Sequence, residues 1–124
     1  MNYRNETYLV LSEKAEGKLT GDVEVILYGK KSKHVNFISG SVLFQMKKLS
    51  FKEDKVITDW LDTLNADLDE TFEVVAKGGQ FDEIEHITNA PERKRLSVEI
   101  RVMINSVPVD LYVPENNPPE GELK

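Results

Sequence analysis

Alternation of apolar and polar residues, the pattern typical of half-buried β-strands, recurs along most of the chain. The clearest example is Leu96–Ile104, where every second residue is apolar and those between are mostly polar. In Asp22–Tyr28 the apolar residues 23, 25 and 27 alternate in the same way. Pro108 cannot donate a ladder hydrogen bond, so we place the last strand at a sheet edge. The predicted strands are Thr7–Leu11, Asp22–Tyr28, Val35–Met46, Thr71–Lys77, Leu96–Ile104 and Val109–Val113.

The apolar positions change parity inside the third of these strands. Val35 and Phe37 have odd numbers, whereas Val42 and Phe44 have even numbers, and Ser39-Gly40-Ser41 lies between the two pairs. A one-residue β-bulge there would return all four side chains to one face. A tight turn at the same place is the alternative, but it would leave very short strands. We therefore favour the bulge.

A helical period follows. Ser50 and Glu53 match a capping box, with Ser50 as N-cap. Apolar residues then recur three or four positions apart, as on the core-facing side of an amphipathic helix. These residues are Ile57, Trp60, Leu61, Leu64 and Leu68. The pattern predicts a helix over residues 51–68, with Trp60 in the core. The outer side of this helix carries Asp59, Asp62, Asp69 and Glu70.

These elements predict one α+β domain. Residues 80–88 fit one short helical face better than a strand, and we predict a helix there. The whole is then a mostly antiparallel sheet of about six strands with the 51–68 helix packed on one face. We assign residues 1–113 to the domain. Residues 114–124 are rich in proline and glutamate and predict a flexible tail.

Composition narrows the classes of function. The chain has 124 residues, a net charge of −6 and no cysteine. Disulfides, thiolate nucleophiles and Cys-ligated metals are therefore excluded. No apolar run approaches the roughly 20 residues of a membrane-spanning helix. The acidic balance argues against nucleic acid as a partner, because such binding depends on neutralising phosphates. We expect a cytoplasmic protein of a bacterial or host cell.

Charge is segregated along the sequence, and this suggests a docking surface. Residues 53–85 contain eleven acidic and two basic residues, a local charge of −9. One interpretation is an ordinary polar helix face that keeps the protein in solution. Another is mimicry of nucleic-acid phosphates. Our functional hypothesis is a non-enzymatic, inhibitor- or immunity-like interaction module, which docks a basic partner through the outer helix face. The proposed contact residues are Asp59, Asp62, Asp69 and Glu70.

Two basic clusters support an alternative function. They are Lys30, Lys31 and Lys33 in one loop, and Arg93 and Arg95 before the strongest strand. Both sets could be ordinary solvated residues. Together they could instead bind a nucleotide or phosphate at a subunit interface.

Oligomerisation is a further expectation. A second, weaker apolar face would be partly exposed or buried against another subunit, and it makes a homodimer or a higher oligomer plausible. Its residues are Ile26, Tyr28, Leu43 and Met103. A structural or assembly subunit is therefore another alternative.

His86 is a candidate for metal binding or acid–base chemistry. Asp82 and His86 are four residues apart and would share a face, where they could hold a metal or form an acid–base pair. No second histidine or nucleophile lies nearby in the sequence. We therefore predict no catalytic residue, no metal site and no cofactor.

Overall fold

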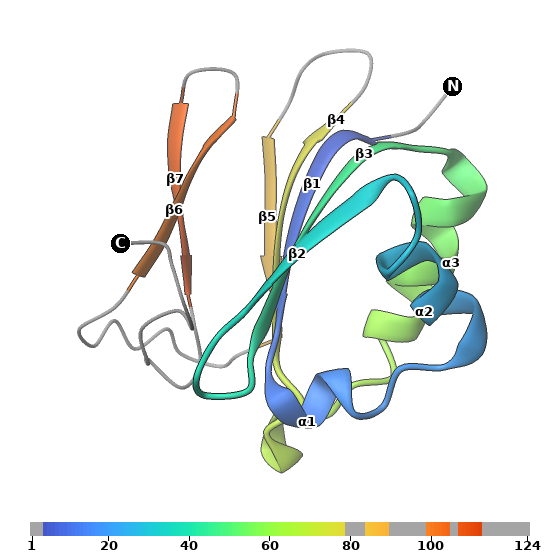
Figure 1. Ribbon diagram of the computed structural model, residues 1–124, viewed down its shortest axis with the longest axis vertical. Coiled ribbons are helices and arrows are strands. Elements are labelled where there is room, and N and C mark those ends of the chain that lie inside the picture. Colours follow the sequence, from blue (N-terminus) through green and yellow to red (C-terminus); the bar gives the residue numbers. More distant parts are fainter. Residues whose placement is uncertain (1–3, 79–83, 90–98, 105–106, 113–124) are drawn as a thin grey trace.

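A computed structural model describes residues 4–78, 84–89, 99–104 and 107–112. Within them the chain forms a five-stranded antiparallel sheet, a separate two-stranded hairpin and three short α-helices. The helices lie against one face of the sheet and the hairpin lies over the other (Figure 1). The predicted α+β class with a mostly antiparallel sheet is confirmed, although seven strands are present in two sheets.

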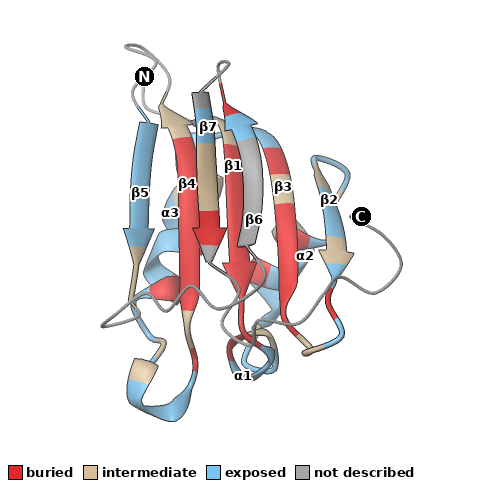
Figure 2. Ribbon diagram, turned by 90° about the vertical axis from the view of Figure 1, so that its left-hand side faces the viewer, coloured by how far each residue is buried: buried red, intermediate tan, exposed pale blue. Residues whose placement is uncertain are grey.

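The sheet has the strand order β2-β3-β1-β4-β5, so β2 and β5 form its edges (Figure 2). All neighbouring strands are antiparallel. In chain order the elements are β1 (Arg4–Leu11), α1 (Glu13–Glu16), α2 (Gly21–Leu27), β2 (Ser32–Asn36), β3 (Val42–Leu49), α3 (Phe51–Leu61), a 3-10 turn (Ala66–Leu68), β4 (Phe72–Gly78), β5 (Ile84–Thr88), β6 (Glu99–Ile104) and β7 (Val107–Tyr112). No helix among the described residues is long and apolar enough to cross a bilayer.

The main core lies between the sheet and the helices. Leu9 of β1 is paired with Phe44 of β3 on one side and Val74 of β4 on the other, and all three are buried. Trp60 of α3 packs on this layer as predicted. Its indole Nε1–H donates to the carbonyl of Lys18, which satisfies the one polar atom of the ring. Burial of each large side chain here contributes about 1.5–3 kcal/mol.

The opposite face of the sheet has its own core, covered by the β6–β7 hairpin. Val10, Leu43 and Val75 of the sheet pack with Ile104 and Leu111 of the hairpin, and all five are buried. The chain therefore covers its second face itself, at least over the central strands.

This arrangement corrects the prediction of a weaker apolar face left for another subunit. Leu43 does lie on the second face, but it is only 8% exposed. Ile26 and Tyr28 belong to α2 and its C-cap, on the helical side of the sheet. Met103 is 57% exposed and lies on the hairpin. The homodimer remains a prediction, but the four residues of this face no longer support it.

Residues 22–27 lie in α2 and Tyr28 is its C-cap, so the strand predicted over Asp22–Tyr28 is wrong. Val23 and Leu27, one helical turn apart, are buried against the sheet, and Ile26 packs beside them. Val25 is 73% exposed. These residues fit both periods, because 23, 26 and 27 share one helical face while 23, 25 and 27 alternate. The loop after α2 therefore joins a helix to β2 and is not a hairpin turn.

Ser39 and Gly40 lie in a tight turn between β2 and β3, so the predicted bulge is wrong. The N–H of Phe37 donates to the carbonyl of Ser41, and the N–H of Gly40 donates to the carbonyl of Phe37. Gly40 has φ +97°, where L-residues are strained. A Cβ on Gly40 would also come within 2.7 Å of the Glu13 side chain. The parity change marks two short strands rather than one bulged strand.

α3 starts at the predicted capping box but ends earlier than predicted. Ser50 Oγ accepts from the N–H of Glu53, and the Glu53 carboxylate accepts from the N–H of Ser50. The helix ends at Leu61 instead of reaching residue 68, and Leu68 is 56% exposed. After Leu61 the segment 62–71 leads the chain back to the sheet, where β4 begins at Phe72.

The helix predicted over 80–88 is also wrong where the structure describes it. Residues 84–88 form β5, which pairs with β4 so that His86 lies opposite Val75. The poor alternation of this segment reflects its position at the sheet edge, where both faces are exposed. Residues 80–83, the start of the predicted strand at 96–98 and the tail at 114–124 lie outside the described residues.

Candidate functional site

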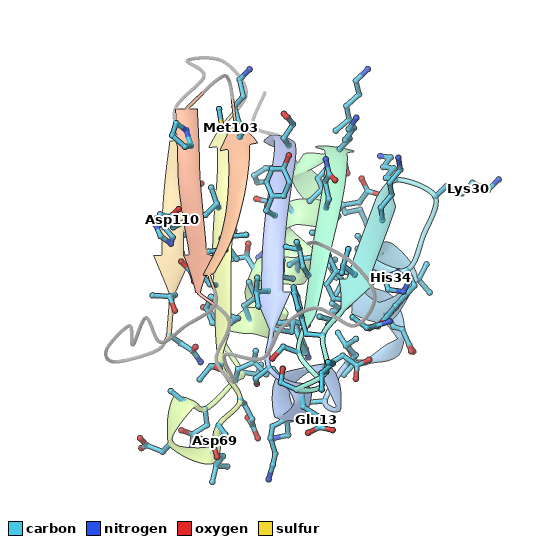
Figure 3. All side chains as sticks on the ribbon, turned by 60° about the vertical axis from the view of Figure 1, so that its left-hand side comes forward. Glu13, Lys30, His34, Asp69, Met103 and Asp110 are labelled. Atoms are coloured by element: carbon cyan, nitrogen blue, oxygen red, sulfur yellow. The ribbon has the colours of Figure 1, made fainter. Side chains whose placement is uncertain are left out.

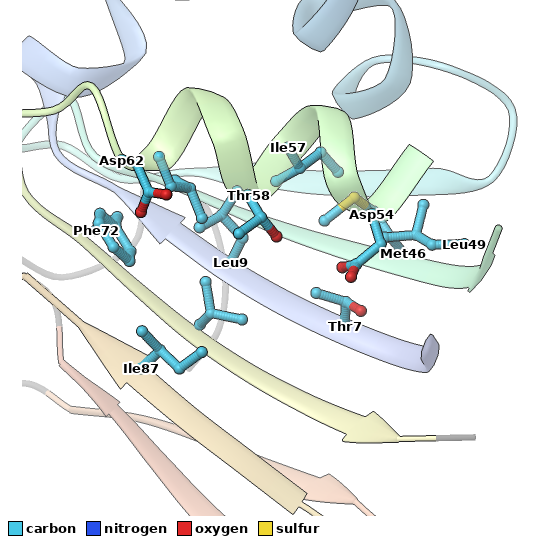
Figure 4. A pocket seen from close by; sticks show the side chains of 12 residues that line it. Thr7, Leu9, Met46, Leu49, Asp54, Ile57, Thr58, Asp62, Phe72 and Ile87 are labelled. Carbon is cyan, nitrogen blue, oxygen red and sulfur yellow. The ribbon is translucent and has the colours of Figure 1, made fainter. Parts of the chain in front are cut away.

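A narrow groove lies between α3 and the sheet, where residues of β1, β3, β4 and β5 line it (Figure 4). Its floor is apolar and is made by Leu9, Phe72, Val74 and Ile87, with Leu61 from the helix. The enclosed space is about 50 Å³, against about 10–15 Å³ for one water molecule. The groove can therefore take the end of one apolar side chain, but it is too small for a drug-sized ligand of about 300 Å³ or more.

The helical wall of the groove is polar. Asp54, Thr58 and Asp62 follow one another at four-residue spacing and line the same side of α3. The buried residues Ile57 and Leu61 fix the rotation of the helix that produces this placement. Figure 4 shows Asp54 and Asp62 toward opposite ends of the groove with Thr58 between them. The sequence prediction found Asp62 but missed Asp54 and Thr58.

A buried hydroxyl lines the groove without a hydrogen-bond partner. Thr7 of β1 is 4% exposed, and its Oγ1 has no partner within the described part of the chain. A buried polar group left unpaired costs about 1–3 kcal/mol. A group bound in the groove could supply the missing hydrogen bond.

Asp62 lies at the C-terminal end of α3, where the helix dipole makes a carboxylate unfavourable. It is the C-cap residue of α3, and the last turn of this helix contains no basic residue. The negative end of a helix dipole makes an acidic residue there unfavourable by about 0.3–1 kcal/mol. Asp62 is exposed. Local stability therefore does not explain this carboxylate.

The four acidic residues predicted as one docking face are not brought together. Asp59 pairs with Lys55 at 3.0 Å on the other side of α3. Asp69 has φ 64° after the 3-10 turn and lies at the opposite end of the molecule from Met103 (Figure 3). Glu70 is 5% exposed. Only Asp62 lines the groove.

Glu70 makes contacts inside the protein that the helical pattern of residues 51–68 does not predict. Its Oε1 accepts from the N–H of Asn65, and its Oε2 lies 3.0 Å from Lys18 Nζ. The Asn65 N–H first, and then Lys18, hold the pKa of this carboxyl below its ordinary value. Glu70 therefore fixes the loop before β4 and is unavailable for docking.

The basic residues predicted as a ligand site are partly brought together. Lys30, Lys31 and Lys33 line a surface hollow of about 290 Å³ together with Lys47 and Lys48 of β3. The sequence prediction missed the β3 lysines because it placed β2 and β3 in one strand. The hairpin register, which sets Lys33 opposite Gln45, would have revealed them. Arg93 and Arg95 lie outside the described residues.

His86 has a carboxylate partner other than the one considered from the sequence. Its Nε2 contacts the Oε2 of Glu73, a β4 residue that is 2% exposed. Asp82 lies outside the described residues. Glu73 was missed because it stands among buried apolar residues of β4, and only the β4–β5 register brings it near His86. The described residues contain no group of three potential ligands that could hold a metal ion.

Comparison with known proteins adds no relative to this picture. No family model, no curated protein and no solved structure matches the chain. The groove and the surface hollow lined by lysines are therefore the features that bear on function.

Proposed function

We propose that this chain is a non-enzymatic protein-interaction module that binds a basic segment of a partner protein in the groove between α3 and the sheet. One observation carries the proposal: an apolar floor, an acidic wall and the unpaired hydroxyl of Thr7 occur in the same groove. An inhibitor or an immunity-like protein would act through such a surface.

The dimensions of the groove specify the bound segment. Asp54 and Asp62 are eight residues apart, which is about 12 Å along a helix. Four residues of an extended chain span about 13 Å, and every second side chain lies on one face. An extended segment with basic residues four positions apart and an apolar residue midway would therefore place two cations near the two carboxylates. The apolar residue would enter the cavity between them.

The edge strand β5 supports an extended bound conformation. Among the described residues β5 pairs with β4 alone, and Figure 2 shows it as the outermost strand of the sheet. Ile87 of this strand lines the groove and is 44% exposed. An extended partner segment could therefore enter the groove across this open edge, over Ile87.

A synthetic peptide with leucine at its centre and lysine two residues away on each side tests the proposal. Fluorescence polarisation should show saturable binding to the intact chain. Asp62→Lys should weaken this binding at least about tenfold, because it replaces attraction by repulsion at one end of the groove. A peptide of the same composition with adjacent lysines should bind more weakly.

Asp67→Lys is the matched control, since Asp67 is exposed on the 3-10 turn and lines no part of the groove. It makes the same charge change and should leave peptide binding unaltered. Asp62→Lys should also raise the free energy of unfolding by about 0.3–1 kcal/mol through the helix dipole, which separates lost binding from lost folding. Equal binding of the two peptides, or equal loss in both variants, would contradict the proposal.

A further inference from the structure

A second surface, at the opposite edge of the sheet, carries the opposite charge. The hollow lined by Lys30, Lys31, Lys33, Lys47 and Lys48, here called the lysine hollow, lies at the β2–β3 end of the sheet. β2 is one edge strand of the sheet. The hollow and the groove have no lining residue in common, although β3 contributes Lys47 and Lys48 to the hollow and Met46 and Leu49 to the groove. Figure 3 shows Lys30 beside β2, away from β5.

The positive charges of the lysine hollow are mostly uncompensated. Within the described residues only Lys31 of these lysines forms an ion pair, with Glu53 at 2.8 Å, and Lys47 has Glu6 of β1 as its cross-strand neighbour. The pKa of the Glu53 carboxyl is held below its ordinary value, first by Lys31 and then by the N–H of Ser50. The other four lysines repel one another around a common space, although the chain as a whole has a charge of −6. A bound anion would remove this repulsion.

The backbone around the lysine hollow is held in place by Lys31 and Lys48. Lys31 Nζ donates to the carbonyl of Lys48 at 3.2 Å as well as to Glu53, so one side chain joins the loop, β3 and the start of α3. Lys48 has φ 56°, a conformation rare for a residue with a Cβ. Strained backbone of this kind is concentrated at binding sites. The lysines thus project from a constrained frame.

The chemistry of the lining favours phosphate. Every described cation of the hollow is a lysine, which acts as a compact point charge and not as the planar fork that arginine offers to carboxylates. Gln45 is its one neutral lining residue, and no aromatic ring lines it to stack on a nucleobase. A volume of about 290 Å³ fits a small molecule and not a folded partner.

We infer that the lysine hollow binds a small ligand with several linked phosphate groups, such as a free oligophosphate. Several phosphates are required because four lysines that form no ion pair within the described residues surround one space. Lys33 and Lys47 would contact the ligand from neighbouring strands, while Lys31 keeps its contact with Glu53. This inference does not depend on the proposed function, since the groove and the lysine hollow share no lining residue.

Titration calorimetry with sodium tripolyphosphate tests the inference on the intact chain. Binding should be saturable at one ligand per chain and should weaken as salt is added, because the charges are exposed. The double variant Lys33→Glu/Lys47→Glu should bind at least about tenfold more weakly. Lys33→Gln/Lys47→Gln gives a milder loss and serves if charge reversal disturbs folding.

Lys14→Glu is the matched control for the single variant Lys33→Glu, because Lys14 is exposed on α1 and does not line the hollow. It should change the dissociation constant less than about twofold. Failure of tripolyphosphate to saturate, or an equal loss in Lys14→Glu, would overturn the inference. A short oligothymidylate should bind more weakly per phosphate than tripolyphosphate. Tighter binding of the oligothymidylate would reject a free oligophosphate as the ligand in favour of a nucleic-acid backbone.

Discussion

Lys48 connects backbone conformation with the placement of charge. Met46 and Leu49 both lie in the helix-facing core although they are three residues apart, which regular alternation in a strand does not allow. The positive φ of Lys48 between them produces the change of parity. A residue with a Cβ pays about 1–2 kcal/mol for this left-handed conformation. Position 48 therefore carries a lysine although a glycine there would make the folded protein more stable.

Lys48→Gly should therefore raise the free energy of unfolding by up to about 1 kcal/mol, because glycine adopts the left-handed conformation without strain. The same variant should bind tripolyphosphate more weakly, since one cation of the lysine hollow is lost. Lys47→Gly is the control. It removes an adjacent lysine from regular strand and should lower stability by about 0.5–1 kcal/mol. Urea unfolding measures both, and a destabilised Lys48→Gly variant would contradict this account of the strain.

Single residues also show how far the sequence could predict the site. Asp62 was identified because helical periodicity held as far as Leu61. Glu70 was placed on the same face only because the helix was extrapolated beyond its end. Thr7 could not have been identified, since an unpaired hydroxyl becomes visible only when its neighbours are placed. The side of α3 on which Asp62 lies follows from the local helical period, whereas the surroundings of Thr7 and Glu70 depend on contacts between distant residues.

At the scale of elements, capping chemistry was predicted better than strand patterns. The pair Ser50 and Glu53 defines the start of α3 because both hydrogen bonds of a capping box are local. α2 was missed because seven residues are too few to separate a period of 2 from one of 3.6. β5 was missed because an edge strand exposed on both faces lacks alternation.

The capping box of α3 makes a pH-dependent contribution to stability. The pKa of Glu53 is lowered in the folded chain, chiefly by Lys31. Its contribution is therefore fully present above the unfolded pKa of about 4.3 and is lost as the pH falls through the lower folded pKa. Glu53→Gln removes the ion pair and should cost less than about 1 kcal/mol at pH 7. This difference from the unaltered chain should shrink below about pH 4.

Ser50→Ala is the comparison for this pH effect. It removes a neutral hydroxyl that accepts from the Glu53 N–H, and its cost of about 1 kcal/mol should persist through the acid range. Chemical unfolding between neutral and acid pH distinguishes the two variants. A Glu53→Gln difference that does not change with pH would show that the ion pair with Lys31 adds nothing.

At the scale of the whole molecule, sheet topology converts segregation of charge along the sequence into segregation in space. The lysines of the basic loop and of β3 line a hollow on the β2–β3 side of the sheet, whereas Asp54 and Asp62 of α3 line a groove that extends from β3 to β5. The sequence predicted the two charged segments but not their separation, because strand order depends on pairing between distant residues. The result is a chain with an acidic groove under α3 and a basic hollow beside the edge strand β2.

The β6–β7 hairpin covers the second face of the sheet, and variants in it test whether the domain unfolds in a single transition. Ile104 is buried against the sheet, whereas its neighbour Met103 is 57% exposed on the same strand. Ile104→Ala should lower the free energy of unfolding by about 2–5 kcal/mol, and Met103→Ala should change it by less than about 0.5 kcal/mol.

Urea unfolding of Ile104→Ala can be followed by Trp60 fluorescence, which reports from the opposite face of the sheet. If the hairpin is integral to the domain, the Trp60 signal shifts to lower urea together with circular dichroism in one transition. Partial loss of the cover should also expose Leu43 and Val10, so this variant should self-associate at concentrations where Met103→Ala remains unchanged. An unshifted Trp60 transition in Ile104→Ala would instead mean that the five-stranded sheet and its helices are stable without the hairpin.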